Sequence, residues 1–389
     1  MIGRLGLRTQ LRWALLGLLV VAGAGAASAK APPASSYLVY AGTTSAGIYS
    51  YRFDSKTGQL TALGKVAECD HCEWLATDPQ HRFLYVLGDG LRNRGAHQAN
   101  GFLSSYSIER ETGKLTFLNQ VDSGGSIPAH LLVDPSGKTL FVANYGNGNL
   151  ISFAIKPDGS VGERIGFDQY TGSSIDTVRQ EGPHAHEVVL SPDNRFLFVP
   201  DLGTDQIKIY RVDSAKGTFT PNDPPTVTVK AGLGPRHFIF GHGAKFAYVL
   251  CEMGSTVLVL SYDPAKGSLT PVQTIANLPA DFKGVDNSSE IGIGRSGRFL
   301  YTSNRGHDSI TVFAIDPAKG TLTKIDTVPT GKIPRSFAID PTGKYLVVGS
   351  QMSNNIAVFA IGQKDGLLKQ SGQPLDISAP VVISFVPAE

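Results

Sequence analysis

Short apolar runs alternate with polar turns along most of the chain, and the same arrangement returns about every 50 residues. Each unit consists of a strand, a turn, a second strand, a polar loop and a third strand. Five such units begin at His130, His186, His237, Glu290 and Ser336, and a degenerate copy begins at Glu73. The first turn is Asp-Pro-x-Gly-Lys or a variant of it, in which Pro presets φ and Gly accepts a positive φ. The following run of Val, Leu, Phe and Tyr is typical of a buried strand.

A second turn, such as Asp-Pro-Ala-Lys-Gly at 263–267 and 316–320, leads into a fourth strand that begins with Leu or Leu-Thr. Seven first turns can be aligned, 46 to 57 residues apart, at Pro79, Pro135, Pro192, His242, Arg295, Pro341 and Pro387. This spacing is typical of four-stranded propeller blades. The sequence therefore predicts an all-β fold, a seven-bladed β-propeller. A β-sandwich or a solenoid is the alternative.

The two ends of this repeat complement each other. Residues 37–53 supply outer strands with no inner strand before them, and residues 380–387 supply an inner strand with no outer strands after it. We expect both termini to build one blade, because such closure removes the free sheet edges of an open array.

The first 29 residues differ from the repeat. Arg4, Arg8 and Arg12 precede an apolar run over 13–26, and Ala27-Ser28-Ala29 follows it. This order is typical of a secretory signal peptide, so we expect cleavage after Ala29, a single propeller domain over 30–389, and a periplasmic or secreted protein. An uncleaved anchor is the alternative.

The charge and composition of the chain limit the classes of partner that we expect. The formal net charge of the 389 residues is +2 and no long basic run is present, so nucleic acid is not expected. No segment beyond the N-terminal run is apolar enough for a membrane span, and we expect a monomer or a weak homodimer. The sequence leaves the state of Cys69 and Cys72 open, and a disulfide between them is one interpretation in an oxidising compartment. A free or metal-binding pair is the alternative, although one Cys-x-x-Cys supplies too few ligands for a zinc site.

In each blade, the start of the first strand and the end of the second strand share one face near the central channel. The predicted first-strand starts are Glu73/Trp74, Ala129/His130, His186/Glu187, Arg236/His237, Ser289/Glu290, Arg335/Ser336 and Val381/Val382. The predicted second-strand ends are Asp89, Asn144/Tyr145, Asp201/Leu202, Cys251/Glu252, Asn304/Arg305 and Ser350/Gln351. Arginine, histidine and carboxylate side chains gather at these positions, and a funnel of mixed charge suits a small anionic substrate.

Several segments at these positions resemble the lactonase family of seven-bladed propellers. They are Gly182-Pro183-His184-Ala185-His186, Asp201-Leu202-Gly203, Gly234-Pro235-Arg236-His237 followed by Glu252, Ala143-Asn144-Tyr145, and Ser303-Asn304-Arg305-Gly306-His307-Asp308. The family is similar to bacterial 6-phosphogluconolactonase and to fungal carboxy-cis,cis-muconate lactonizing enzymes. The resemblance covers residues 37–387 and implies chemistry on lactones, opening or closing them, without an obligatory metal. We expect hydrolysis of a small anionic sugar lactone to the open-chain acid, with no cofactor.

The resemblance also implies active residues, namely His186 (or His184), Arg236, Glu252 and Arg305. Ring opening requires a base that activates water and a cation that stabilises the oxyanion. We expect His186 to act as the base, Glu252 as its partner or as the acid, and the two arginines to hold the oxyanion. The residues assigned to substrate binding are His184, His130, Tyr145 and Arg335.

Other interpretations remain open. Arg236 and Glu252 could form only a structural ion pair, His184 and His237 could only bind loop carbonyls, and Asp201, Asp205 and Asp308 are expected to tie down loops. The whole protein could be a non-enzymatic binding propeller, a lactonizing cycloisomerase, or a metal-dependent lactonase with ligands Asn144, Asp201, Glu252 and Asn304. Two segments near the predicted site depart from the family pattern and could alter substrate choice, the 69–72 loop and the 89–101 insert with Arg92, Arg94 and His97.

Overall fold

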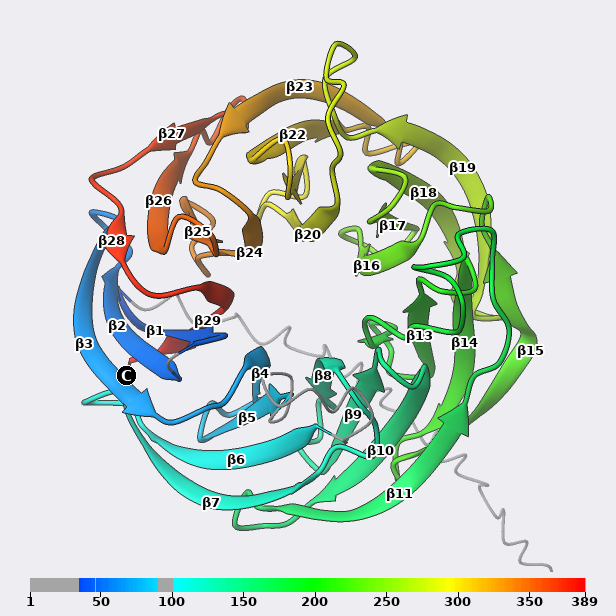
Figure 1. The fold of residues 1–389 in the computed structure, drawn as a ribbon, viewed down its shortest axis with the longest axis horizontal. Coiled ribbons are helices and arrows are strands. Elements are labelled where there is room, and N and C mark those ends of the chain that lie inside the picture. Colours follow the sequence, from blue (N-terminus) through cyan, green and yellow to red (C-terminus); the bar gives the residue numbers. More distant parts are fainter. Residues whose placement is uncertain (1–34, 46, 90–100, 389) are drawn as a thin grey trace, which may run out of the picture. The chain divides into compact units, whose positions relative to one another are not determined.

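The computed structural model describes residues 35–45, 47–89 and 101–388. The predicted signal peptide and nearly all of the 89–101 insert lie outside these ranges. Within them, all helix and strand elements are strands, grouped into seven sheets around a common centre (Figure 1). The predicted seven-bladed β-propeller is confirmed. No helix in the described ranges is long and apolar enough to cross a membrane.

Each blade is an antiparallel sheet whose strands follow one another from the central channel outward. From the innermost strand, blade 1 contains β29 (Pro380–Pro387), β1 (Ser36–Thr43), β2 (Ile48–Asp54) and β3 (Gln59–Ala67). Blade 2 contains β4 (Cys72–Thr77), β5 (Phe83–Gly88), β6 (Phe102–Glu109) and β7 (Lys114–Asp122). Blade 3 contains β8 (Pro128–Val133), β9 (Thr139–Asn144), β10 (Asn149–Ile155) and β11 (Val161–Gln169). Blade 4 contains β12 (Val189–Leu190), β13 (Phe196–Asp201), β14 (Gln206–Asp213) and β15 (Thr218–Thr228).

The remaining blades follow the same order. Blade 5 contains β16 (Pro235–Phe240), β17 (Phe246–Cys251), β18 (Thr256–Asp263) and β19 (Ser268–Ala276). Blade 6 contains β20 (Ser288–Ile293), β21 (Phe299–Asn304), β22 (Ser309–Ile315) and β23 (Leu322–Pro329). Blade 7 contains β24 (Pro334–Ile339), β25 (Tyr345–Ser350), β26 (Asn355–Ile361) and β27 (Leu368–Gln370), and β28 (Leu375–Asp376) also pairs with β26.

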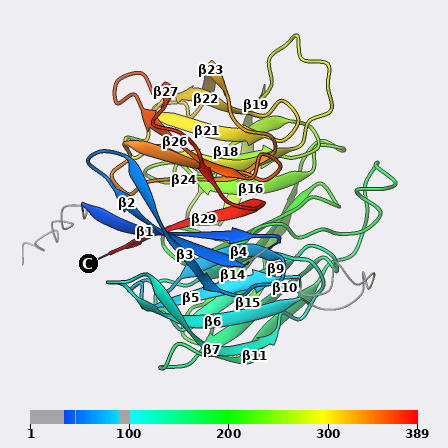
Figure 2. The same ribbon diagram turned by 60° about the vertical axis from the view of Figure 1, so that its left-hand side comes forward.

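The closure of the ring by both termini is confirmed. β29 runs antiparallel to β1, with Tyr37 opposite Pro387 and Ala41 opposite Ile383. Figure 2 shows β29 beside β1. The C-terminal strand therefore takes the innermost place of a blade whose other strands come from the N-terminal part, and the inner edge of β1 is not left unpaired.

The hydrophobic core lies between the blades. Successive residues of a strand point to opposite faces, so β5 sends Leu84 and Val86 into the core shared with blade 1, and Tyr85 and Leu87 into the core shared with blade 3. The buried apolar residues of the described ranges divide into seven clusters, one for each contact between neighbouring blades. This arrangement explains why the second strands are continuously apolar.

Buried tyrosines join neighbouring blades through one repeated hydrogen bond. A second-strand phenol donates to the carbonyl of a turn glycine in the next blade, at 2.9 to 3.1 Å. The pairs are Tyr40 with Gly113, Tyr85 with Gly159, Tyr248 with Gly320, and Tyr301 with Gly366. These glycines have positive φ, which explains the glycine of the second turn.

The cysteines take two different positions. Cys69 and Cys72 are joined in a disulfide, one of the two states that the sequence left open. Cys251 is a buried free thiol at the end of β17, packed in the core between blades 4 and 5. The disulfide closes the loop that leads directly into Glu73 of β4.

Candidate functional site

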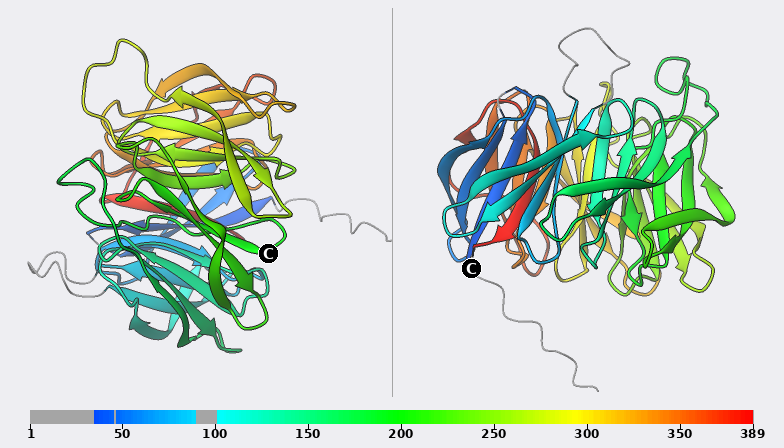
Figure 3. Two further views of the ribbon diagram at one scale, coloured as in Figure 1. Left: turned by 90° about the vertical axis from the view of Figure 1, so that its right-hand side faces the viewer. Right: turned by 90° about the horizontal axis from the view of Figure 1, so that it is seen from below.

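One backbone hydrogen bond recurs in all seven blades and forms the rim of the central channel. The residue after the second strand donates its N–H to a carbonyl just before the first strand, at 2.8 to 3.1 Å. The donor and acceptor pairs are Thr44 and Ala379, Asp89 and His71, Tyr145 and Ile127, Leu202 and His184, Glu252 and Gly234, Arg305 and Asn287, and Gln351 and Ile333. The turns between strands lie on two opposite faces of the ring (Figure 3), and these pairs place the ends of all second strands on one of them.

A β-bulge at the start of the first strand directs a second set of side chains to this rim. The pairing skips one residue in four blades, and the skipped residues are Glu73, Ala129, Arg236 and Arg335. A bulge inserts one unpaired residue and redirects its side chain. Three of these four residues are charged, so the bulge presents charge where a regular ladder would continue.

A pocket of about 240 Å³ opens at this rim. Its lining residues are Glu73, Ile127, Ala129, Tyr145, Arg179, His186, Glu252, Arg305 and Arg335. Seven of these nine occupy positions predicted from the repeat. The other two were missed: Ile127 directly precedes β8, and Arg179 lies in the irregular segment between β11 and β12, where no repeat guides the alignment.

Glu252 is the centre of the charged groups in the pocket. Its Oε2 accepts hydrogen bonds from Arg236 Nε at 2.9 Å and Arg305 Nη2 at 2.8 Å, and its Oε1 accepts from Arg179 Nη2 at 2.5 Å. The Glu252 side chain is only 6% exposed. The expected contact between Arg236 and Glu252 within blade 5 is therefore present, and blade 6 contributes Arg305 as predicted.

The electrostatics of Glu252 favour the ionised carboxylate. Burial alone would raise the pKa of Glu252, but the positive charges of Arg305, Arg236 and Arg179 outweigh burial and hold this pKa well below its usual range. A carboxylate of this kind is a poor proton donor at neutral pH. Of the two roles considered for Glu252, the arrangement supports that of a negatively charged partner.

His186 lies next to this carboxylate in the pocket. Its Nε2 is 4.0 Å from Glu252 Oε2, beyond hydrogen-bonding distance, and its buried Nδ1 has no hydrogen-bond partner in the described part of the chain. Burial and then the charges of Arg236 and its neighbours lower the pKa of His186 well below the usual value. The imidazole is therefore neutral at neutral pH, with a lone pair available to accept a proton.

Arg236 lies behind Glu252 rather than in the pocket wall, and a buried chain of polar groups holds it. Its Nη1 donates to the Ser289 carbonyl and to His237 Nε2, the latter at 2.9 Å, and His237 Nδ1 lies 2.8 Å from Glu290 Oε1. Because a guanidinium only donates, His237 Nε2 must accept and Nδ1 must carry the proton. His237 thus binds two side chains, instead of the loop carbonyls considered from sequence.

Two residues predicted to bind substrate lie behind the lining residues. His184 stacks on Tyr145 with ring centres 4.2 Å apart, and its Nδ1 lies 2.9 Å from the Tyr145 carbonyl. His130 is one residue beyond the bulge at Ala129 and packs on Trp74, with ring centres 4.3 Å apart. Neither imidazole lines the pocket; His184 supports the wall through Tyr145, whereas Trp74, on which His130 packs, is not a lining residue.

Arg335 does line the pocket, where it pairs with Glu73. Arg335 Nη2 lies 2.7 Å from Glu73 Oε2, and His71 Nδ1 lies 3.0 Å from Glu73 Oε1. Glu73 directly follows the Cys69–Cys72 loop. The 69–72 segment therefore adjoins the pocket wall through the contact of His71 with Glu73, although none of its four residues is a lining residue.

The loop aspartates hold the segments that carry the pocket side chains. Asp201 accepts from the backbone N–H of His184 and Gly203, and Asp308 accepts from Ile333 N, just before β24. Asp205 accepts from Ser174 Oγ, Gln180 Nε2, Gly232 N and Gly234 N, at 2.6 to 2.7 Å. Asp205 therefore ties the loop of Arg179 to the segment that leads into Arg236.

The oxygen groups considered as metal ligands do not share one site. Asn144 and Asn304 donate their side-chain N–H to partners within their own blades, Asp201 accepts from loop N–H groups, and Glu252 is occupied by three arginines. No group of three or more His, Cys, Asp or Glu side chains that could hold a metal ion occurs in residues 35–45, 47–89 and 101–388.

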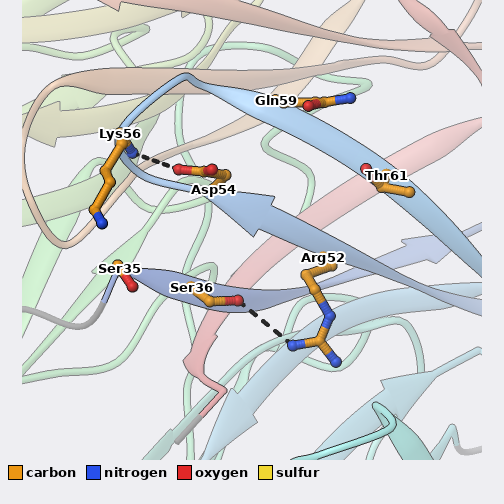
Figure 4. A pocket seen from close by; sticks show the side chains of 7 residues that line it. All are labelled: Ser35, Ser36, Arg52, Asp54, Lys56, Gln59 and Thr61. Atoms are coloured by element: carbon orange, nitrogen blue, oxygen red, sulfur yellow. Dashed lines mark hydrogen bonds between the residues drawn. The ribbon is translucent and has the colours of Figure 1, made fainter.

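A second pocket, of about 300 Å³, lies on the first blade (Figure 4). Arg52, Asp54 and Lys56 line it, with Ser35, Ser36, Gln59 and Thr61. Arg52 Nη1 donates to Ser36 Oγ at 3.4 Å, and the Asp54 carboxylate accepts from the Lys56 backbone N–H at 2.7 Å. These are ordinary contacts of a strand edge and its turn. The smaller pocket at the rim contains the convergent charges and is the better candidate for chemistry.

The chain is similar to several known proteins. The sequence matches the family described as "Lactonase, 7-bladed beta-propeller" over residues 37–385. It is 31% identical to a 6-phosphogluconolactonase of Bacillus subtilis, over 90% of this chain and 99% of the relative, and 34% identical to one of Formosa agariphila, over 85% and 93%. The solved periplasmic gluconolactonase of Pseudomonas aeruginosa superimposes with a TM-score of 0.85 at 31% identity, covering 91% of this chain and all of that one.

Proposed function

The chain belongs to the lactonase family of seven-bladed β-propellers and is a lactonase similar to 6-phosphogluconolactonases, and from this premise we propose that it hydrolyses a small anionic sugar lactone to the open-chain acid in the rim pocket. One observation carries the proposal. A neutral imidazole with an unpartnered nitrogen, His186, lies beside an ionised carboxylate that three guanidinium groups surround.

In the proposed reaction, His186 accepts a proton from water as the water oxygen attacks the lactone carbonyl carbon. The resulting oxyanion is stabilised by the guanidinium group of Arg305, which lines the pocket, and by the more distant positive charge of Arg236 behind Glu252. When the tetrahedral intermediate collapses, the bond between the carbonyl carbon and the ring oxygen breaks. The imidazolium of His186 then returns its proton to the leaving alkoxide, which gives a hydroxy acid.

Glu252 acts in this scheme as a fixed negative charge. It orients Arg236 and Arg305, and it stabilises the imidazolium that forms at His186, 4.0 Å away. Tyr145 and Arg335 line the same pocket and hold the substrate in this scheme, while His184 supports Tyr145 by stacking on it and His130 packs on Trp74. Arginines outnumber carboxylates around Glu252, which favours a substrate with negative charge.

Acid release from glucono-δ-lactone and its 6-phosphate tests the proposal, measured against the spontaneous rate at neutral pH. A rate well above the spontaneous one, with the hydroxy acid as product, supports hydrolysis. Ring closure of an unsaturated acid without hydrolysis would instead indicate a lactonizing cycloisomerase. No rate above the spontaneous one on any lactone would leave a non-enzymatic binding propeller.

We also propose that residues 1–29 form a cleaved signal peptide, and that residues 30–389 act as one exported domain in the periplasm or medium, as a monomer or a weak homodimer. The Cys69–Cys72 disulfide suits an oxidising compartment, and the Pseudomonas relative is named as periplasmic. Sequencing of the N-terminus of the exported protein should give Lys30 first, and retention of residues 1–29 would contradict the proposal.

A further inference from the structure

The three arginines that contact Glu252 are held in different ways. Arg305 donates from Nε to the Asn287 carbonyl at 3.0 Å and from Nη2 to the Ser288 carbonyl at 3.3 Å. Arg236 donates to the Ser289 carbonyl and to His237. Both guanidinium groups are therefore fixed to the backbone of blade 6 as well as to Glu252.

Among the described residues, the guanidinium of Arg179 forms hydrogen bonds with side chains only. Its guanidinium contacts Glu252 Oε1 at 2.5 Å and Tyr145 Oη at 3.5 Å. The Arg179 side chain is 37% exposed, whereas those of Arg236 and Arg305 are 4% and 13% exposed. Arg179 is thus the guanidinium that can change partner without losing a hydrogen bond to a backbone carbonyl.

The backbone of Arg179 is nevertheless firmly placed. The Asp176 carboxylate accepts from the N–H groups of Val178 and Arg179, each at 2.9 Å. Gln180 binds Asp205 Oδ2 at 2.7 Å and the Leu202 carbonyl at 2.9 Å. The backbone of Arg179 is therefore a fixed point at the pocket wall, and a change of partner would need rotation of the side chain only.

We infer that Arg179 is the specificity-determining residue for a negatively charged substituent on the lactone, an inference that rests on the proposed lactonase function. In the free protein Arg179 pairs with Glu252. When a substrate enters, Arg179 exchanges this carboxylate for the phosphate or carboxylate group of the ligand, while Arg236 and Arg305 remain on Glu252.

The exchange leaves no buried charge unpaired. Glu252 keeps two charge-assisted hydrogen bonds, and Arg179 replaces one anion by another. A guanidinium fork fits a phosphate or a carboxylate equally well in geometry, because both present two oxygens at matching spacing. Displacement of Arg236 or Arg305 would leave a backbone carbonyl of blade 6 without its donor, which costs more.

Steady-state kinetics with three lactones test the role of Arg179. The lactones are glucono-δ-lactone (neutral), its 6-phosphate, and glucaro-1,4-lactone, which carries a carboxylate. The proteins are the chain from Lys30 onward, Arg179→Gln, Arg179→Lys and Arg195→Gln. Arg195 is a suitable control because it also pairs with a carboxylate, Asp193, but does not line the rim pocket.

For Arg179→Gln we expect KM for the charged lactones to rise about 10- to 100-fold, the size of effect of a lost charge-assisted pair. The neutral lactone should change less than about threefold, Arg179→Lys should restore part of the loss, and Arg195→Gln should match the wild type. The charged lactone with the larger rise identifies the anion. An equal loss on neutral and charged lactones would overturn the inference, because Arg179 would then act through Glu252.

Calorimetric titration separates this inference from the lactonase proposal. The wild type should bind 6-phosphogluconate more tightly than gluconate, and Arg179→Gln should lose that preference. If wild-type protein opens no lactone but shows this Arg179-dependent preference, the proposed hydrolysis fails and the role of Arg179 stands. If Arg179→Gln binds both acids as the wild type does, the role of Arg179 fails whatever the activity.

Discussion

Arg236 Nε lies 2.9 Å from Glu252 Oε2, across the first two strands of blade 5. The contact depends on two local features, the bulge that turns Arg236 toward the rim and the hydrogen bond from Glu252 N to the Gly234 carbonyl. The ion pair is therefore set by the blade itself, and blade 6 and the 171–183 loop add Arg305 and Arg179 to it.

Replacement of Glu252 by Gln should destabilise the protein by about 3–5 kcal/mol, because three buried or half-buried guanidinium groups would lose their counter-charge. Denaturant unfolding at neutral pH measures the loss. The partly exposed Arg179 adds little to it, since exposed pairs are weak.

The stability difference between the wild type and Glu252→Gln should also depend on pH. The pKa of Glu252 is lower in the folded than in the unfolded state, so its stabilisation is complete above the unfolded pKa of about 4.3 and is lost as the pH falls toward the folded pKa. The stability difference between wild type and Glu252→Gln should be constant from neutral pH to about pH 5 and shrink only below the unfolded pKa. A difference that shrinks already near neutral pH would contradict the ionised state of Glu252.

Replacement of His186 by Asn should lower kcat about 10²- to 10⁴-fold with the fold retained, because a general base contributes on that scale. Since the pKa of His186 is lowered, the base stays unprotonated into mildly acidic solution, and the acidic limb of the wild-type rate profile should lie below about pH 6.5. That limb should be absent in the variant. The control is His242→Ala, in a turn outside the pocket, and equal losses in both variants would argue against a specific role for His186.

The disulfide should contribute little to stability, because it closes a loop of only a few residues. Joint replacement of Cys69 and Cys72 by Ser is expected to lower the free energy of unfolding by at most about 2 kcal/mol. Thermal unfolding of the variant, and of wild type under reducing conditions, measures this value. A much larger loss, or unfolding on reduction alone, would show that the 69–72 loop is held by the disulfide rather than by its packing.

The repeat explains why much of the rim could be predicted from sequence. The turns and apolar second strands fix the blade register, and the register fixes which residue follows each second strand, such as Tyr145, Glu252 and Arg305. The structure adds that, in four blades, the first-strand bulge selects one residue of the predicted pair. Ala129 therefore lines the pocket and His130 does not.

Arg179 could not be found in this way. It lies in an irregular segment without strand periodicity, and its position depends on long-range hydrogen bonds from Gln180 and Ser174 to Asp205. In the neighbouring Gly-Pro-His-Ala-His segment, only the histidines stand out from the sequence as candidate functional residues. The contact between this loop and Glu252 can be predicted only when the three-dimensional fold is known.

The most direct test of the account is the rate of ring opening of 6-phosphoglucono-δ-lactone by the chain from Lys30 onward, beside Arg236→Ala and Glu252→Ala variants whose folding has been checked by circular dichroism. We predict a wild-type rate well above the spontaneous one. In Arg236→Ala, kcat/KM should fall about 10²- to 10³-fold, as for the loss of one oxyanion-stabilising group, and it should fall comparably in Glu252→Ala, because the arginines lose the carboxylate that orients them. Wild-type activity that survives both substitutions would contradict a reaction at the Glu252 cluster.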